Sequence, residues 1–204
     1  MRDPLVFLAV IALLTVTPGA DMAMVSRSVF MGGRRAAFGT TLGIAAGCLL
    51  WALASAAGVA AVLAASETAY DALRLVGAAY LVWLGVQSLL AARRGYRDEA
   101  APGSSARTAP SPFRQGLLTN LFNPKIALFY TTFLPQFIGP GDPVLLLSVA
   151  MAGVHIVLGI LWLSAYAWLL ARAVETFRGS RLRRSLDTLT GVVLVGLGIR
   201  VAAD

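Results

Sequence analysis

Leu121-Phe122-Asn123-Pro124-Lys125-Ile126 places a helix-breaking proline and a charge in the middle of a long apolar run. Lys125 is the sole lysine of the chain, and the other 16 of its 17 basic residues are arginines. A lysine at the centre of a bilayer costs roughly 2.5 to 3.5 kcal/mol, so it normally faces a partner, a cavity or a substrate path. A lysine can also reach the interface along its own stem, but a neighbouring proline is typical of membrane helices that are broken around a site.

The composition is that of an integral membrane protein. Hydrophobic residues make up 58% of the 204-residue chain and charged residues 13%, with a mean hydropathy of +0.76. A spanning helix needs about 20 apolar residues, so the chain has room for about six spans and no separate soluble domain. The net charge of +7 does not indicate nucleic-acid binding, because the arginines lie at the ends of apolar segments without interleaved aromatic residues. The single cysteine, Cys48, excludes a disulfide and a thiolate metal site.

Six apolar segments predict an all-α membrane protein with six transmembrane helices. They cover residues 4–31, 36–64, 69–92, 113–138, 144–171 and 186–201. Residues 93–112, rich in Arg, Gly, Ser, Ala and Pro, are expected to form a flexible cytoplasmic linker between two halves, 1–92 and 113–204. Each half holds three segments, the first of which is interrupted at Thr17-Pro18 or at Asn123-Pro124. Because three is odd, the repeat must be inverted in the membrane, as in many secondary transporters.

The two interruptions predict a binding site at the middle of the membrane. A continuous helix over residues 4–31 would be about 42 Å long, more than the roughly 30 Å hydrocarbon core requires. Thr17 can serve as the N-cap and Pro18 as the first residue of a restarted helix. Helices that restart at Pro18 and Pro124 direct unpaired N–H groups towards a substrate carboxylate, while the carbonyl groups before each break can hold an ammonium. This polarity fits a zwitterion.

Two charged residues and one histidine are the central candidates within this site. Asp21 and Lys125, one from each half, can pair in the empty site or engage the ammonium and carboxylate of an amino acid. The alternative for Asp21 is a carboxylate that stabilises the first turn of a helix. His155, the only histidine, either fills a hydrogen bond inside the bundle or takes part in substrate or proton transfer. It shares a helix face with Gly159, Trp162 and Tyr166. The predicted substrate and coupling residues are Thr17, Pro18, Gly19, Asp21, Asn123, Pro124, Lys125, Tyr130, His155, Trp162 and Tyr166, of which Tyr130, Trp162 and Tyr166 are expected to set the pocket size.

Two further patterns concern packing and orientation. Gly39, Gly43 and Gly47 form one smooth face of the second segment, which predicts close internal packing or a homodimer through glycine-rich helix faces. Loops one, three and five hold thirteen arginines, whereas the opposite side holds three. The positive-inside rule therefore predicts that these loops are cytoplasmic and that both termini are extracytoplasmic.

Four groups of residues, in order along the chain, resemble the LysE/RhtB family of amino-acid exporters. They are Thr17-Pro18-Gly19-Ala20-Asp21; Gly33-Arg34-Arg35-Ala36 with Gly43-Ile44-Ala45-Ala46-Gly47; Gly77-Ala78-Ala79-Tyr80-Leu81-Val82-Trp83-Leu84-Gly85; and Asn123-Pro124-Lys125 with Phe133-Leu134-Pro135-Gln136-Phe137. The resemblance covers nearly the whole chain. It implies six helices and the export of amino acids or their derivatives across a bacterial-type inner membrane, driven by the proton-motive force. One departure is Ala20, where members often have a second proline.

The sequence favours other functions less. A primary pump would need a phosphate-binding GxxxxGK[ST] loop, but the sole lysine follows a proline. An intramembrane hydrolase would need a nucleophile beside a base, and His155 with Ser148 or Ser164 is the available combination. An exporter of a metal cation would want several deep carboxylates or thiolates, whereas only Asp21 lies deep. A non-catalytic membrane scaffold protein would not need a helix break at the corresponding place in each half. We therefore expect a transporter of protons and a small molecule rather than an enzyme, without a cofactor or a resident metal; export of a metal cation or another small solute is the alternative.

Overall fold

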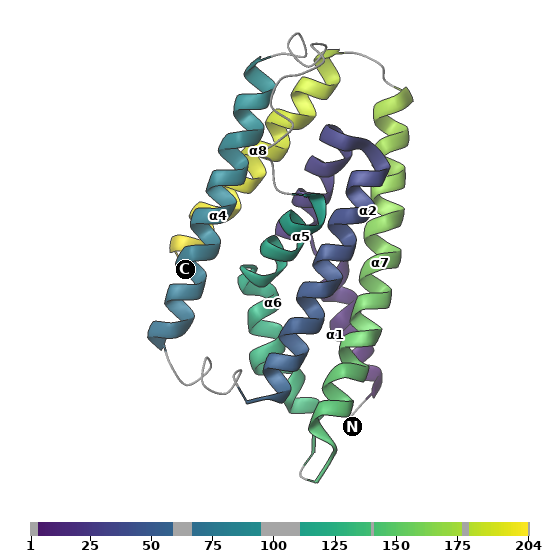
Figure 1. The fold of residues 1–204 in the computed structure, drawn as a ribbon, viewed down its shortest axis with the longest axis vertical. Helices are drawn as coiled ribbons and strands as arrows, with labels where there is room; N and C mark the ends of the chain where they lie inside the picture. Colours follow the sequence, from purple (N-terminus) through teal and green to yellow (C-terminus); the bar gives the residue numbers. More distant parts are fainter. Residues whose placement is uncertain (1–3, 59–66, 95–110, 140, 177–179, 204) are drawn as a thin grey trace.

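The computed structural model describes residues 4–58, 67–94, 111–139, 141–176 and 180–203, which are helical apart from short turns (Figure 1). In chain order the helices are α1 (Pro4–Val16), α2 (Ala20–Ala56), α4 (Glu67–Arg94), α5 (Pro112–Leu121), α6 (Pro124–Leu128), α7 (Val144–Thr176) and α8 (Ser180–Ala203). After α6 the chain continues as a π-helical segment, Phe129–Phe133, and a 3-10 turn, Leu134–Phe137. The all-helical prediction is confirmed for the described residues.

The α2 element is a helical hairpin. Gly33 interrupts it with φ 66° and ψ −162°, and this positive φ favours glycine because a residue with a Cβ would be strained there. The first arm, residues 20–32, continues the first predicted segment, and the second arm, residues 34–56, forms the second segment. Ser28 and Thr40 join the two arms through a buried hydrogen bond of 2.7 Å between their hydroxyl groups.

The segments of the chain run in alternating directions (Figure 1); α1 with the first arm of α2 forms one such segment, and α5 with α6 forms another. The Gly33 turn, the end of α4, the start of α5, the end of α7 and the start of α8 lie towards one end of the molecule, which we call the Gly33 end. Among the described residues, two elements are long and apolar enough to cross a membrane, namely the α2 hairpin (Ala20–Ala56) and Val144–Val174. Pro4–Val16 and Thr188–Leu197 are shorter apolar helices. The arrangement of six spans as an inverted repeat stays a prediction.

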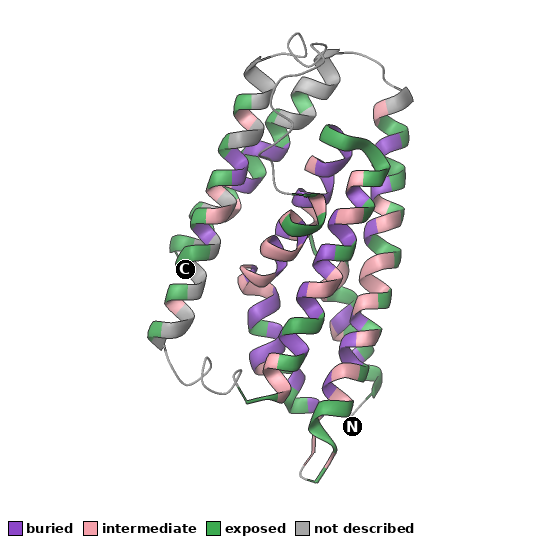
Figure 2. Cartoon of the chain, in the orientation of Figure 1, coloured by how far each residue is buried: buried purple, intermediate pink, exposed green. Residues whose placement is uncertain are grey.

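Two groups of helices make up the fold. In one group α4 packs along α8, and in the other the arms of α2 pack against α5 and α7. The largest core lies in the second group, where Ile11, Trp51, Tyr130 and Met151 are buried together. A smaller core around Met24, Leu84 and Leu194 joins the α4–α8 pair to α2. Buried residues face the inside of the α2, α5, α6 and α7 group, whereas exposed residues on α7 face outward (Figure 2).

The ends of several segments differ from the prediction. The helix of the second segment ends at Ala56, because Gly58 takes a φ of 79° and closes its C-terminus. The fifth segment continues as α7 to Thr176. Of the predicted linker, residues 93–94 still belong to α4, and Pro112 opens α5 with Ser111 as its N-cap. Residues 59–64 of the second segment and 95–110 of the linker lie outside the described residues.

The glycine face of the second arm packs within the chain. A Cβ on Gly43 would collide with the carbonyl oxygen of Phe113, and a Cβ on Gly116 of α5 would collide with that of Thr40. The missing side chains let α2 and α5 approach backbone to backbone, as small residues do in membrane helices. The prediction of internal packing is confirmed for this face, which is therefore covered and not free to bind a second copy.

Gly43→Ala is expected to lower the yield of folded protein in detergent severalfold. Even one methyl group would push α5 away from α2, and overpacking of this kind typically costs about 1 to 3 kcal/mol. The measurement is the monodisperse fraction on size-exclusion chromatography after heating. Gly153→Ala is the matched control, because a Cβ on Gly153 would meet no atom within 4 Å. Equal thermal survival of the two variants would contradict the tight contact between α2 and α5.

Candidate functional site

The first helix break lies at Thr17-Pro18-Gly19. α1 ends at Val16, and α2 begins at Ala20 with Gly19 as its N-cap in an extended conformation, φ −174° and ψ −164°. The Thr17 hydroxyl donates back to the Leu13 carbonyl at 2.6 Å, so it does not cap the new helix. The break is where the sequence predicts it, but the assignment of Thr17 as N-cap and Pro18 as the first helical residue is wrong.

The second break lies at Phe122 and Asn123, between α5 and α6. Asn123 is the N-cap of α6, and its Oδ1 accepts a hydrogen bond from the Lys125 backbone N–H at 3.1 Å. Pro124 is the first helical residue, a position where its missing N–H leaves no intrahelical bond unmade. The predicted interruption at Asn123-Pro124 is therefore confirmed.

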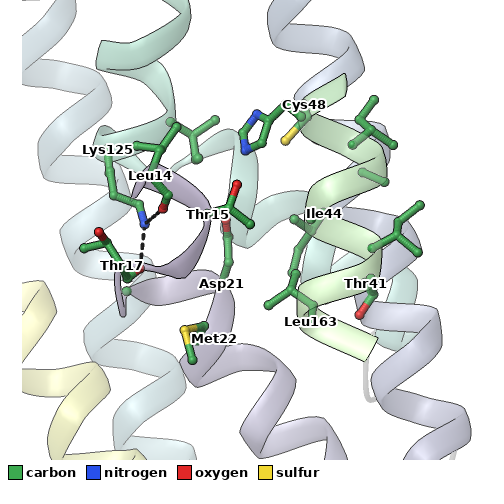
Figure 3. Close-up of a pocket in the computed structure, with 17 residues that line it drawn as sticks. Leu14, Thr15, Thr17, Asp21, Met22, Thr41, Ile44, Cys48, Lys125 and Leu163 are labelled. Carbon is green, nitrogen blue, oxygen red and sulfur yellow. Dashed lines mark hydrogen bonds between the residues drawn. The ribbon is translucent and has the colours of Figure 1, made fainter. Parts of the chain in front are cut away.

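Both breaks border one cavity of about 40 Å³, enclosed by α1, the two arms of α2, α6 and α7 (Figure 3). Five of the predicted site residues line it, namely Thr17, Gly19, Asp21, Lys125 and His155. Much of the remaining lining is apolar and includes Leu14, Ile44 and Leu163. A cavity of this size holds a few water molecules. The cavity is therefore too small for an amino acid in this conformation, which we call the closed one.

Lys125 stabilises the broken end of α1. Its Nζ donates to the carbonyl oxygens of Leu14 at 3.1 Å and Thr17 at 3.0 Å (Figure 3). A helix C-terminus leaves carbonyl groups without partners and carries negative dipole character, so an ammonium is favoured there. Gly19 leaves the space for this side chain, since a Cβ on Gly19 would lie 3.4 Å from Nζ. The predicted pairing of Lys125 with Asp21 is not what the structure shows; the lysine itself fills the carbonyl site that we expected a substrate ammonium to occupy.

Asp21 is held by Asn120, a residue that the sequence analysis missed. The Asn120 Nδ2 donates to Asp21 Oδ2 at 3.2 Å and to Cys48 Sγ at 3.5 Å. Asp21 Oδ1 is buried and has no hydrogen-bond partner among the described residues. Gly47 makes the position possible, because a Cβ there would lie 2.5 Å from Asn120 Oδ1. The signal available in the sequence was an asparagine four residues before Pro124, within an apolar run; its full burial appears only in the structure.

His155 connects the cavity to the core. Its Nδ1 lies 3.1 Å from the Tyr130 hydroxyl, and the two rings stack at 5.9 Å between centroids. Tyr130 is fully buried behind the histidine and does not line the cavity. One ring nitrogen of His155 is thus within hydrogen-bonding distance of a residue inside the bundle, which was one of the two predicted roles. The ring also borders the cavity, as the other predicted role requires. Ser148 and Ser164 are not hydrogen-bonded to it, since their hydroxyl groups are buried without a partner among the described residues.

The predicted face of α7 is divided among different surroundings. Gly159 lines the cavity beside His155, whereas Tyr166 donates to or accepts from the Ser26 hydroxyl at 2.7 Å. Tyr166 and Pro18 instead border a separate, largely apolar cavity of about 340 Å³ between α2, α7 and α8. Trp162 is 36% exposed and lines none of the described cavities. In this conformation, therefore, Tyr130, Trp162 and Tyr166 do not line one common cavity.

Comparisons with known proteins add a family and several relatives. The family model described as LysE type translocator matches residues 12–204. The membrane protein YrhP of Bacillus subtilis (strain 168) is 29% identical over 98% of both chains. The homoserine/homoserine lactone efflux protein of Salmonella typhimurium is 26% identical over 97% of this chain and 94% of its own. The threonine efflux protein of Escherichia coli (strain K12) is 29% identical over 91% of this chain and 90% of its own. No solved structure matches.

Proposed function

Because this chain belongs to the LysE type translocator family, we propose that it exports an amino acid or an amino-acid derivative from the cytoplasm, by secondary active antiport with protons. The observation that carries the proposal is the cavity between the two helix breaks, which is bordered by one carboxylate and one ammonium. Relatives named for threonine and homoserine efflux support an amino acid as the substrate. The site contains groups for binding both charges of a zwitterion, and transport requires no bond to be broken.

The free hydrogen-bonding positions of the site suit a zwitterion. The Lys125 ammonium has three donors, of which two are used by the Leu14 and Thr17 carbonyls, so one remains for a substrate carboxylate. Asp21 Oδ1 is the unused acceptor for the substrate ammonium. The proposed assignment therefore has Lys125 and Asp21 bind opposite ends of the same molecule.

The cavity must enlarge before it can hold an amino acid. Its volume of about 40 Å³ accommodates water and not a substrate, which supports a closed state between two open ones. Alternating access of this kind commonly moves one repeat against the other around a fixed site. We accordingly propose that transport opens the cavity first on one side and then on the other.

Contacts between α4 and α8 support the inverted repeat. Gly85 follows Pro18 by 67 residues, and Gly191 follows Pro124 by the same 67. A Cβ on Gly85 would lie 2.8 Å from the Gly191 carbonyl oxygen, and a Cβ on Gly191 would lie 2.9 Å from that of Gly85. The flanking contacts follow the same rule, because Gly85 meets Val195 and Gly191 meets Leu89, which is the counterpart of Val195. Counterparts that touch one another are expected where a two-fold axis relates the halves.

A second pair of counterparts meets at the proposed substrate site. The same numbering offset makes Gly19 the counterpart of Lys125. The Lys125 Nζ lies 3.4 Å from the position of a Cβ on Gly19. The proposed axis therefore passes both between α4 and α8 and through the cavity, which is the arrangement of transporters whose sites lie between inverted repeats.

The proposed orientation has both termini on the extracytoplasmic side of a bacterial-type inner membrane. It rests on the thirteen arginines in loops one, three and five against three on the other side. The alternating helix directions support it, because they bring the Gly33 turn and the starts of α5 and α8 to one end. A reporter fused after residue 204 should be active only if it is translocated; activity of the same reporter within 95–110 would reverse the orientation.

The direct test measures efflux of amino acids from cells and from proteoliposomes. Cells are loaded with dipeptides, with threonine and homoserine first in the panel, and efflux is followed with and without an uncoupler. We expect efflux of at least one amino acid that depends on the chain and falls severalfold with the uncoupler. Divalent metal ions are tested in parallel, because metal export is the alternative. Normal efflux of metal or of another solute, with no amino-acid transport, would overturn the proposal.

A further inference from the structure

A second cavity opens at the Gly33 end, next to the closed site. It measures about 310 Å³ and lies between the second arm of α2 and the C-terminal part of α7. Its lining consists of Arg34, Arg35, Phe38 and Thr41 from α2, and Ser164, Ala167 and Trp168 from α7. We call it the basic groove, because its two charged residues are arginines.

The basic groove and the closed cavity lie along the same seam between α2 and α7. On α2, Thr41 borders both spaces, with Arg34 and Phe38 on one side and Ile44 and Cys48 on the other. On α7 the lining passes from Ser164 in the groove to the preceding residue, Leu163, in the cavity. Ile44 and Leu163 are each 5% exposed and belong to one packed cluster. A thin layer of side chains around Ile44, Thr41 and Leu163 therefore separates the groove from the site.

The groove has the chemistry of a carboxylate site. Arg34 and Arg35 are exposed and line the groove. A guanidinium presents parallel donors that match the two oxygens of a carboxylate. The Ser164 hydroxyl in the lining is buried and has no partner in the described part of the chain. Two guanidinium groups and the unpaired Ser164 hydroxyl thus border a space large enough for an amino acid.

We propose that the basic groove is a carboxylate-recognition vestibule, where Arg34 and Arg35 bind the carboxylate of the exported amino acid before it passes along the α2–α7 seam. This inference rests on the proposed function and on the cytoplasmic placement of the Gly33 end. It adds a binding site to that function. When Ile44 and Leu163 then move apart, the vestibule becomes continuous with the cavity that Asp21 and Lys125 line.

The first experiment measures transport kinetics in proteoliposomes. Arg34→Gln and Arg35→Gln are expected to raise the KM for cytoplasmic-side amino acid about threefold to tenfold, with little change in the maximal rate, because charge focusing in a cleft acts on substrate capture. High salt should shrink the difference between wild type and variants. Arg34→Lys and Arg35→Lys should recover part of the affinity. Arg114→Gln is the matched control, since Arg114 is an exposed arginine at the same end that does not line the groove.

The second experiment needs no knowledge of the substrate, because the sole cysteine reports on the path. Cys48 lines the closed cavity and is 3% exposed, so a thiol reagent reaches it only when the seam or the opposite side opens. A negatively charged sulfonatoethyl methanethiosulfonate is applied to the Gly33 end. Its reaction with Cys48 is expected to slow about threefold to tenfold in Arg34→Gln and Arg35→Gln. The reaction of Cys48 with the positively charged trimethylammonium analogue should not slow in these variants. In Arg114→Gln, the reaction with neither reagent should slow.

The outcomes separate this inference from the proposed function. If wild type transports no amino acid but the anionic reagent reacts more slowly with Cys48 in Arg34→Gln and Arg35→Gln, the proposed substrate is wrong. The groove then stands as an anion-binding vestibule. If amino-acid efflux is normal and neither KM nor reagent rate changes in the variants, the vestibule is wrong and the proposed function stands. Anionic lipid headgroups offer the same chemistry as a carboxylate. A KM effect that disappears in vesicles of neutral lipid alone would assign the groove to lipid and overturn the inference.

Discussion

Lys125→Met is expected to reduce gradient-driven efflux on the order of a hundredfold, to the level of empty vesicles. Methionine preserves much of the stem but removes the ammonium, and with it the bonds to the Leu14 and Thr17 carbonyls. Hydrogen bonds to a charged group contribute about 1.5 to 3 kcal/mol, and two carbonyl groups would lose theirs. The substrate carboxylate would lose its proposed donor at the same time. The measurement is efflux of a preloaded amino acid from proteoliposomes under an imposed pH gradient.

Lys125→Arg separates charge from geometry. The guanidinium keeps the positive charge near the end of α1, but its planar fork is larger than an ammonium and must fit against Gly19. We expect folded yield close to wild type and transport that stays strongly reduced. Wild-type rates in Lys125→Met would leave the lysine with a purely anchoring role and would remove it from the site.

Asp21→Asn is expected to abolish uphill efflux while the protein still folds. The amide that replaces the carboxylate can keep the contact with Asn120, because an asparagine oxygen also accepts a hydrogen bond. It cannot carry a proton across the cycle, and it offers the substrate ammonium no charge. If Asp21 couples the proton, downhill exchange should persist in this variant and should no longer respond to a pH gradient.

The control for this prediction is Asp71→Asn, which neutralises a carboxylate on α4 that does not line the cavity. It should transport as wild type does. His155→Gln completes the comparison, because His155 also lines the cavity and its imidazole can carry a proton. Loss of the pH response in His155→Gln but not in Asp21→Asn would transfer the coupling role to the histidine.

The sequence predicted the features that depend on local chemistry. A proline cannot continue a helix, so both breaks could be located from Pro18 and Pro124 alone. Burying the charge of a lysine is costly, so a single lysine in an apolar run predicted a side chain with partners or beside a cavity, and Lys125 has both. The glycine spacing at Gly43 pointed to a close helix contact, since the period of a helix aligns such residues on one face.

The sequence did not predict features that depend on which segments meet. The acceptors of Lys125 are backbone carbonyls, which every residue has, so no side chain marked them. Nothing in the sequence distinguished Asn120 from other polar residues near a helix end. Its role depends on the packing of α2 against α5, which places Asp21 beside it. Trp162 shares the helix face of His155, but α7 is covered on only part of its surface, and the indole lies 36% exposed. Gly19 rather than the predicted Thr17 is the N-cap of α2, and the Thr17 hydroxyl instead donates to the Leu13 carbonyl in the preceding turn.

The meeting of Lys125 with Gly19 has a consequence for how such a protein can be encoded. Two identical halves that meet on a two-fold axis must carry the same residue there, which would give two glycines or two mutually repelling lysines. If the proposed two-fold axis relates the halves, a lysine that faces a glycine requires two different halves, so a homodimer of two identical halves could not form this cavity. In the proposed repeat, a single chain that joins the two halves can carry a lysine at position 125 and a glycine at position 19.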